Sequence, residues 1–347
     1  MQVTRKAMLG AVIGVALVTL GASRSLAEDA TVRIAQATSA LSFLPIWAAR
    51  ALDTFKGQGL TLSATVVPGG DPNALAALDS GDVELAAVGS EAVLRAVAKG
   101  QPFQIVASLM SKVTLQLVVS AELAARTGVK PSDPLEKRLA ALKGATVGVS
   151  SIGGAQDTAA RWLAAKGGLD PKLDINVAQV GNPPALRAAL ENKRIDAFVL
   201  SPPEGYLAEK SGAGKILVAL GDVFPLLSNQ PFLVLVAKTP VAPKTADLVR
   251  RALAALAAAS KAVVDNPDAS AAAIQKQFFA RAEPDSITAA VAAMKSGVAD
   301  GGRLSAEGLQ NLLVFSKEVG TDFGREFDAR TSENQLWTNS FLPPAAK

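Results

Sequence analysis

A glycine-rich turn at residues 150–158, SSIGGAQDT, has the composition of a small anion site. It follows a short β-branched run, ATVGVS, and precedes the segment TAARWLAAKGG, which predicts a helix. The first N–H groups of a helix have no intrahelical acceptor and carry partial positive charge. Glycines let a ligand approach the backbone and serine hydroxyls add donors, so Ser150, Ser151, Gly153 and Gly154 could hold an oxyanion. The alternative for a single turn of this kind is a capped turn without a ligand.

Polar turns also follow the other predicted strands. ATSALSFLPIW (37–47) comes after a predicted strand at 31–36, and PGG (68–70) and VGSEA (88–92) follow the next two. In the second half of the chain, LSPPEG occupies 200–205. Several such turns on one side of two sheets favour a binding site over isolated capped turns. The additional candidates are Thr38, Ser39, Ser42, Gly69, Gly70, Ser90 and Ser201, together with Ser111, which stands beside Lys112 at a predicted crossover.

The residue types that are missing limit the chemistry. The chain has no cysteine and no histidine, which excludes thiol chemistry, a Ser-His-Asp triad and zinc–histidine sites. We expect no catalytic residue, no metal site and no cofactor. An enzyme would have to use carboxylates, and Asp157 and Glu204 are the pair that it would use, although Glu204 fits an exposed or capping residue better. Trp47 and Trp162 fit the core, and Tyr206, the single tyrosine, could reach a ligand.

The start of the chain resembles a cleavable signal peptide. Arg5 and Lys6 precede an apolar stretch at 7–21, and SLA at 25–27 suits cleavage before Glu28. We therefore expect export to the periplasm, without the cysteine that a lipid anchor needs. The precursor has a net charge of +4, and removing the three basic residues of 1–27 leaves about +1. No basic stripe with interleaved aromatics occurs, so we expect no nucleic-acid partner.

An internal repeat indicates the architecture. Residues 68–107 align without a gap on residues 180–219, and each copy reads as turn, helix, strand, turn, helix, strand. Strands that alternate with helices predict parallel sheets covered by helices, so we expect an α/β protein of two similar lobes. Turns at the carboxyl ends of such strands are where open α/β sheets bind ligands. The two lobes would therefore face each other across a ligand site.

The remaining segments predict how the lobes are joined. Two apolar strands within 104–123 flank Ser111 and Lys112 and indicate a first crossover, where Lys112 could pair with an anion or simply be solvated. A second crossover is expected near 220–230, before a strand in 231–240. Four helices then follow, and we expect them to pack on the first lobe; they are predicted at 244–267, 268–279, 283–297 and 305–320. The expected domains are a signal peptide (1–27), a discontinuous first lobe (28–118 and 225–347) and a second lobe (119–224).

Four segments carry a resemblance to a known family. They are TVRIAQATSALSFLPIWAARALDTFKGQGL, VVPGGDPNALAALDSGDVELAAVGS, ATVGVSSIGGAQDTAARWLAAKGGLD and RIDAFVLSPP. They resemble the periplasmic substrate-binding proteins of the nitrate/sulfonate/taurine group of ABC transporters, which includes thiamine-precursor binders. The resemblance implies a type II-like two-lobed binding fold that closes over its ligand, and delivery of that ligand to a membrane permease driven by a cytoplasmic ATPase. It implies ligand contacts at Ser39, Leu41, Gly69, Gly70, Ser90, Ser151, Gly153 and Gly154.

The resemblance leaves the ligand open. Aromatic residues make up 5% of the chain, which favours a small oxyanion or sulfonate over a stacked pyrimidine. A related enzyme branch that consumes its own histidine is excluded, because the chain has none. We expect a monomeric transport receptor for a small anionic solute. The alternatives are a sensory module that feeds a membrane-bound regulator and an exported carboxylate enzyme.

Overall fold

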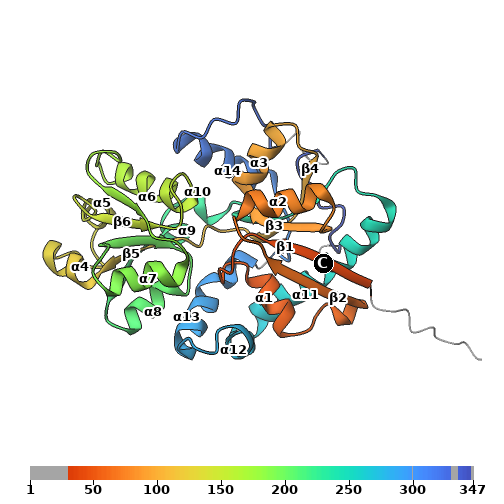
Figure 1. The fold of residues 1–347 in the computed structure, drawn as a ribbon, viewed down its shortest axis with the longest axis horizontal. Helices are drawn as coiled ribbons and strands as arrows, with labels where there is room; N and C mark the ends of the chain where they lie inside the picture. Colours follow the sequence, from red (N-terminus) through yellow and green to blue (C-terminus); the bar gives the residue numbers. More distant parts are fainter. Residues whose placement is uncertain (1–29, 299, 330–334, 345–347) are drawn as a thin grey trace, which may run out of the picture.

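The computed structural model describes residues 30–298, 300–329 and 335–344. The predicted signal peptide at 1–27 lies outside these residues. The described chain forms two lobes, each built on a five-stranded sheet covered by helices (Figure 1). No helix in these ranges is long and apolar enough to cross a membrane.

The first lobe contains residues from both ends of the described chain. Its sheet has the order β2-β1-β3-β10-β4, in which only β10 is antiparallel to its neighbours. Its elements are β1 (Ala30–Gln36), α1 (Leu44–Ala51), η1 (Lys56–Gln58), β2 (Leu60–Val66), α2 (Asp71–Ser80), β3 (Leu85–Gly89), α3 (Ser90–Ala98), β4 (Phe103–Met110), β10 (Leu233–Lys238), α11 (Pro243–Asp265), α12 (Pro267–Phe278), α13 (Pro284–Met294), η2 (Lys295–Val298) and α14 (Ala306–Glu318).

The second lobe is continuous in sequence. Its sheet has the order β7-β6-β8-β5-β9, in which only β5 is antiparallel to its neighbours. Its elements are β5 (Gln116–Ser120), α4 (Ala121–Thr127), α5 (Leu135–Ala140), β6 (Thr146–Val149), α6 (Ala155–Lys166), β7 (Asn176–Gln179), α7 (Pro183–Glu191), β8 (Ala197–Leu200), α8 (Glu204–Lys210) and β9 (Gly214–Ala219), and it is followed by α9 (Leu220–Val223) and α10 (Pro225–Ser228).

The two sheets have the same topology, which confirms the predicted repeat. β1 to β4 of the first lobe correspond in order to β6 to β9 of the second, and β10 takes the place of β5. The aligned segments contain α2-β3-α3 with the start of β4 in one copy and α7-β8-α8-β9 in the other. Each lobe therefore repeats one arrangement of parallel strands and covering helices.

The crossovers join the two sheets at matching edges. β4 ends at Met110, and β5 begins at Gln116 opposite the last residue of β8, Leu200. β9 ends beside the same residue of β5, and the chain returns through 220–232 to β10. Both crossovers thus connect the edges at which the parallel strands end, which we call the interlobe edges. The predicted boundary between 118 and 119 falls inside β5, all of which pairs in the second sheet.

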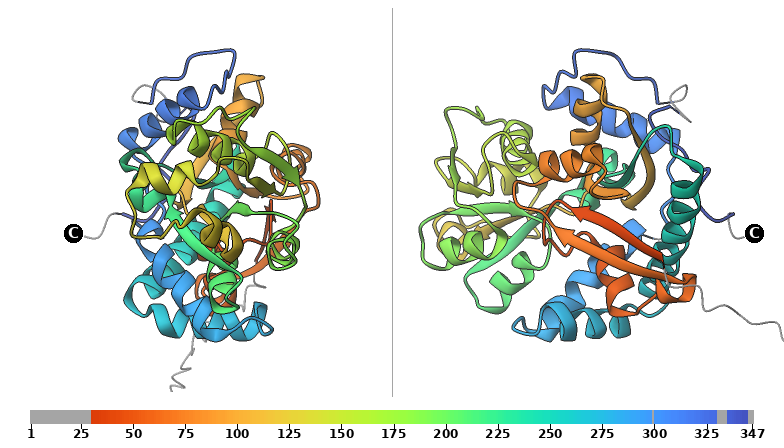
Figure 2. Two further views of the ribbon diagram at one scale, coloured as in Figure 1. Left: turned by 90° about the vertical axis from the view of Figure 1, so that its left-hand side faces the viewer. Right: turned by 45° about the vertical axis from the view of Figure 1, so that its right-hand side comes forward.

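The C-terminal helices pack on the first lobe, as the sequence predicted. Apolar side chains of α11 and α14 such as Val249, Leu253, Leu256 and Leu312 belong to one buried cluster with the strands of the first sheet. Figure 2 shows α11 to α14 distributed around that lobe. Their stripe of apolar residues at helical spacing explains both why they form and which face they bury.

The lobes contact each other on two sides, which we call the first and second flanks. On the first flank, Trp162 of α6 donates from Nε1 to Glu318 Oε2 of α14 at 3.1 Å, and its ring meets Phe315 edge-on at 5.3 Å. On the second flank, Lys210 of α8 pairs with Asp285 of α13 at 3.4 Å. Trp162 is buried, as predicted, but part of its burial comes from the opposite lobe.

Candidate functional site

Three turns of the first lobe come together at its interlobe edge. β1 lies between β2 and β3, and Gln36 stands opposite Val66 and Ala87 in the parallel register. The backbone pairs continue into the turns, because Val67 N donates to Gln36 O and Ala37 N donates to Ala87 O, both at 3.0 Å. The turns after β1, β2 and β3 are therefore neighbours, which is the arrangement that the strand-end argument requires.

In the turn after β1, some of the predicted site residues are exposed and others are buried. Thr38 and Ser39 are exposed, whereas Ser42 is buried. The Leu41 side chain is fully buried in the first-lobe core, so only its backbone could meet a solute. The helix that follows, α1, has Pro45 in its first turn, as predicted. Proline suits this position because it lacks the backbone N–H that would have no acceptor there.

The turn after β2 leads into a carboxylate, that of Asp71, which was not among the predicted site residues. Gly69 and Gly70 have φ of 89° and 72°, a conformation that favours glycine, and Asp71 follows as the first residue of α2. Asp71 Oδ1 accepts from Gly89 N at 3.1 Å, so the side chain links the turns after β2 and β3. Burial raises the pKa of the Asp71 carboxyl, against the Gly89 hydrogen bond and the charge of Arg95. The sequence signal that could have identified Asp71 is an acidic residue directly after a Gly-Gly pair at the start of a predicted helix.

Of the two roles that its position after β3 allows, helix cap and ligand donor, Ser90 does not fill the first. The N-cap is Gly89, no side chain caps the helix, and Ser90 is the first helical residue. It is buried, and its N–H donates to Phe232 O in the second crossover at 3.2 Å. The predicted ligand residue therefore contacts the segment that returns from the second lobe.

In the second lobe, the glycine-rich turn that was predicted to bind an anion already binds a carboxylate of the chain, that of Asp157. Gly153 N donates to Asp157 Oδ2 at 2.7 Å, and Arg161 Nε donates to Asp157 Oδ1 at 2.7 Å. Gly154 N donates to Ser151 O at 3.3 Å. Ser151 is exposed and Ser150 half-buried at the start of this turn, so these hydroxyls and the first turn of α6 remain the groups that could meet a solute.

The turn after β8 is held by contacts within the protein. Ser201 Oγ lies 2.8 Å from Thr114 Oγ1 of the first crossover. Glu204 is 6% exposed and Arg187 Nε donates to its Oε2 at 2.8 Å, so the expectation of an exposed or capping glutamate was wrong. Burial raises the pKa of Glu204, and Arg187 opposes the rise. Each carboxylate that an enzyme would use is thus bonded to an arginine of its own lobe.

The crossover residues are tied to the scaffold. The N–H and Oγ of Ser111 both donate to Gly297 O, at 2.8 and 2.9 Å. Lys112 pairs with Asp222, so it is neither simply solvated nor unpaired. A solute could reach these groups only in competition with the bonds that they already make.

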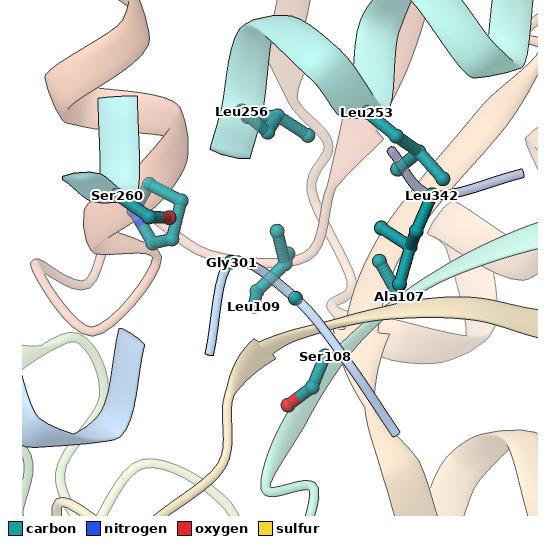
Figure 3. A pocket seen from close by; sticks show the side chains of 10 residues that line it. Ala107, Ser108, Leu109, Leu253, Leu256, Ser260, Gly301 and Leu342 are labelled. Carbon is teal, nitrogen blue, oxygen red and sulfur yellow. The ribbon is translucent and has the colours of Figure 1, made fainter. Parts of the chain in front are cut away.

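A small cavity and a surface groove among the described residues differ in place and size. One cavity of about 10 Å³ lies inside the first lobe among Leu109, Leu253, Leu256 and their neighbours (Figure 3), with room for about one water molecule. A groove of about 310 Å³ lies on the second flank, between α8 and α13, and includes Tyr206 and Asp285. This groove is shallow and open to solvent. Within the described ranges, no cluster of three acidic side chains could hold a metal ion.

The fold is that of periplasmic binding proteins. The E. coli aliphatic sulphonate binding protein SsuA superposes with a TM-score of 0.65 at 17% identity, covering 91% of this chain and 95% of that one. A protein of Bordetella bronchiseptica RB50 gives 0.68 at 24%, covering 90% and 96%. The nitrate-binding protein NrtA of Synechocystis PCC 6803 gives 0.60 at 15%, covering 75% and 69%.

Sequence comparison places the chain in a family. Residues 27–276 match the model of the NMT1-like family, and the chain belongs to that family. YtlA of Bacillus subtilis (strain 168) is 26% identical over 191 residues, which are 55% of this chain and 54% of that protein. The chain therefore spans about half the length of this curated relative. Family and fold confirm the resemblance that the four sequence segments carried.

Proposed function

We propose that this protein is the substrate-binding component of an ABC importer. It captures a small anionic solute between its lobes in the periplasm and delivers it to a membrane permease with a cytoplasmic ATPase. It acts as a monomer and performs no turnover. The observation that carries the proposal is the matched topology of the sheets, whose interlobe edges are joined by two crossovers. Two lobes linked in this way can rotate about the crossovers and close on a solute.

Support for an anion comes from the helix starts. The first turns of α2 and α6 lie at the interlobe edges, where unpaired N–H groups favour negative charge. Exposed hydroxyls of Thr38, Ser39 and Ser151 add donors. The names of similar structures mention a sulphonate and nitrate. Of the predicted site residues, the buried Leu41, Ser42 and Ser90 can contribute only if closure brings solute to their backbone.

The test is a calorimetric titration of the exported, purified protein with nitrate, ethanesulfonate, butanesulfonate and butyrate. Thermal unfolding follows each titration, because a ligand at about a hundred times its dissociation constant stabilises the native state by roughly 2.7 kcal/mol. Binding of one anion class supports the proposal, and its loss in a Ser39→Ala/Ser151→Ala variant supports the site. Ser80→Ala, at the far end of α2, is the matched control. An absence of binding by every anion overturns it.

A further inference from the structure

Three buried glutamines stand where the lobes meet. Gln36 is the last residue of β1, Gln116 is the first residue of β5, and Gln230 lies in the second crossover. They are 0%, 3% and 2% exposed. Within the described part of the chain, the Oε1 atom of each accepts no hydrogen bond. Buried amide oxygens are normally paired, because an unmade bond to a desolvated acceptor is costly, so these three need an explanation.

The orientation of the Gln36 amide is fixed by its neighbour. Gln36 Nε2 donates to Thr38 O in the turn after β1. A carbonyl oxygen can only accept, so turning the amide over would bring two oxygens together. Oε1 is therefore the atom left over, at the end of the strand that lies between β2 and β3.

Gln116 occupies the equivalent edge of the second sheet. Its amide lies against the Tyr206 hydroxyl, which lines the groove of the second flank. A Cβ atom on Gly205 would stand 2.6 Å from Gln116 Oε1, so glycine at this position leaves room for the amide. Gln230, the third glutamine, links the two crossovers through its backbone, because its backbone N–H donates to Ser111 O at 2.9 Å.

Three donors at the interlobe edges are already used within the protein. Gly89 N donates to Asp71, and Gly153 N donates to Asp157. The Ser201 hydroxyl is engaged with Thr114. The Oε1 atoms of the three glutamines accept from none of these groups, so a solute that pairs with them has to bring donors of its own.

The same edges expose apolar side chains. Val66, the last residue of β2, is 39% exposed, and Ile152 in the turn after β6 is 53% exposed. Exposed apolar groups on both edges suit the body of an organic solute rather than an inorganic ion.

We infer that the solute is an organic anion whose body also carries amide N–H donors, which pair with the Oε1 atoms of Gln36 and Gln116. The inference rests on the proposed function and narrows its substrate class. Nitrate and simple alkyl sulfonates lack these donors. An N-acylated amino carboxylate or amino sulfonate has the anionic group, the N–H donor and the organic body that the two edges accommodate.

The test uses pairs of anions that differ by one group. N-acetylglycine and 4-oxopentanoate share shape and charge, but the first has N–H where the second has CH₂. Acetamidomethanesulfonate and 3-oxobutanesulfonate form the corresponding sulfonate pair. Calorimetric titration of the exported protein should show at least one N–H member binding about tenfold or more tightly than its ketone partner.

Two variants on opposite lobes assign the preference to the glutamines. Gln36→Met and Gln116→Met keep the side-chain length and remove the acceptor, so the ratio of affinities should fall toward one. Gln104→Met is the matched control. Gln104 is 6% exposed and lies in the first sheet, at the end of β4 away from the interlobe edge, and its side-chain amide donates to Gln335 O at 3.2 Å. Circular dichroism of each variant checks folding, and either folded variant suffices.

Each outcome decides between the two proposals. Equal binding within both pairs, or a preference for the ketones, overturns the inference and leaves the proposed function standing. Binding of ethanesulfonate or nitrate with no binding of any N–H member does the same. A preference that survives both glutamine variants also overturns the assignment. If no anion of either panel binds, the proposed function itself fails.

Discussion

Replacing Asp157 with asparagine should destabilise the protein, because this carboxylate holds the glycine turn before α6. Its two oxygens accept from Gly153 N and from Arg161 Nε, each at 2.7 Å, and its side chain is 6% exposed. Asparagine has one acceptor oxygen, so Asp157→Asn leaves one of these donors facing an NH₂ group.

The magnitude follows from burial on the two sides of the contact. A hydrogen bond to a buried charged group contributes about 1.5–3 kcal/mol. The Arg161 side chain is 35% exposed and also donates to Pro171 O at 2.7 Å, so water and this carbonyl solvate part of the uncompensated charge. We therefore expect Asp157→Asn to lower the free energy of unfolding by about 2 kcal/mol.

Urea denaturation at pH 7, followed by circular dichroism, measures the difference. Glu122→Gln is the control, since Glu122 and Lys193 form an exposed pair at 3.3 Å whose loss should cost less than about 0.5 kcal/mol. If Asp157→Asn lowers the free energy of unfolding no more than Glu122→Gln does, the argument that this turn is held by the carboxylate is refuted.

Three further substitutions test other contacts. Gly205→Ala should lower the free energy of unfolding by about 1–3 kcal/mol in urea denaturation, because its Cβ would stand 2.6 Å from Gln116 Oε1 and only 3.0 and 3.1 Å from the branched side chains of Ile216 and Val118, and an unchanged midpoint contradicts this. Burial raises the pKa of Asp71 in the native state above its value in the unfolded state. Ionisation of this carboxyl therefore destabilises the wild-type protein as the pH rises, whereas Asp71→Asn has no carboxyl to ionise. Wild type should therefore lose stability relative to that variant as the pH rises from about 4 to 7, whereas a constant difference across urea titrations at this series of pH values argues against it. Glu318→Gln weakens the bond from Trp162 and should increase the radius of gyration in small-angle scattering, and an unchanged radius would show that the first flank does not depend on it.

The architecture could be predicted because it depends on local patterns. The repeat offset placed α7, β8 and α8 in register with α2, β3 and α3, and the apolar runs around Ser111 located the first crossover. Periodicity and turn residues report on neighbours within a few positions along the chain, and both lobes are built from such units.

The site was harder to predict because it depends on contacts between distant segments. The sequence shows Gly153 and Asp157 four residues apart, but not that the carboxylate turns back onto the glycine N–H. The amides of Gln36 and Gln116 are surrounded by residues that the fold brings to the ends of two strands, so their unpaired oxygens leave no local sequence pattern. The same holds for Trp162, whose amphipathic helix predicts a buried ring without indicating that Phe315 of the other lobe covers it.

Each flank joins the lobes by a polar contact and an apolar one. The first flank combines a hydrogen bond to Glu318 with aromatic packing of Trp162 against Phe315, and such packing contributes beyond its buried area. The ion pair recorded on the second flank, Lys210 with Asp285, has side chains 53% and 86% exposed, and a pair of that kind contributes about 0–1 kcal/mol. The groove of about 310 Å³ lies beside this weaker pair. Tyr206 of α8, which lines this groove, also packs against the buried cluster of the first lobe, so a rotation about the crossovers has to separate an apolar contact on this flank as well.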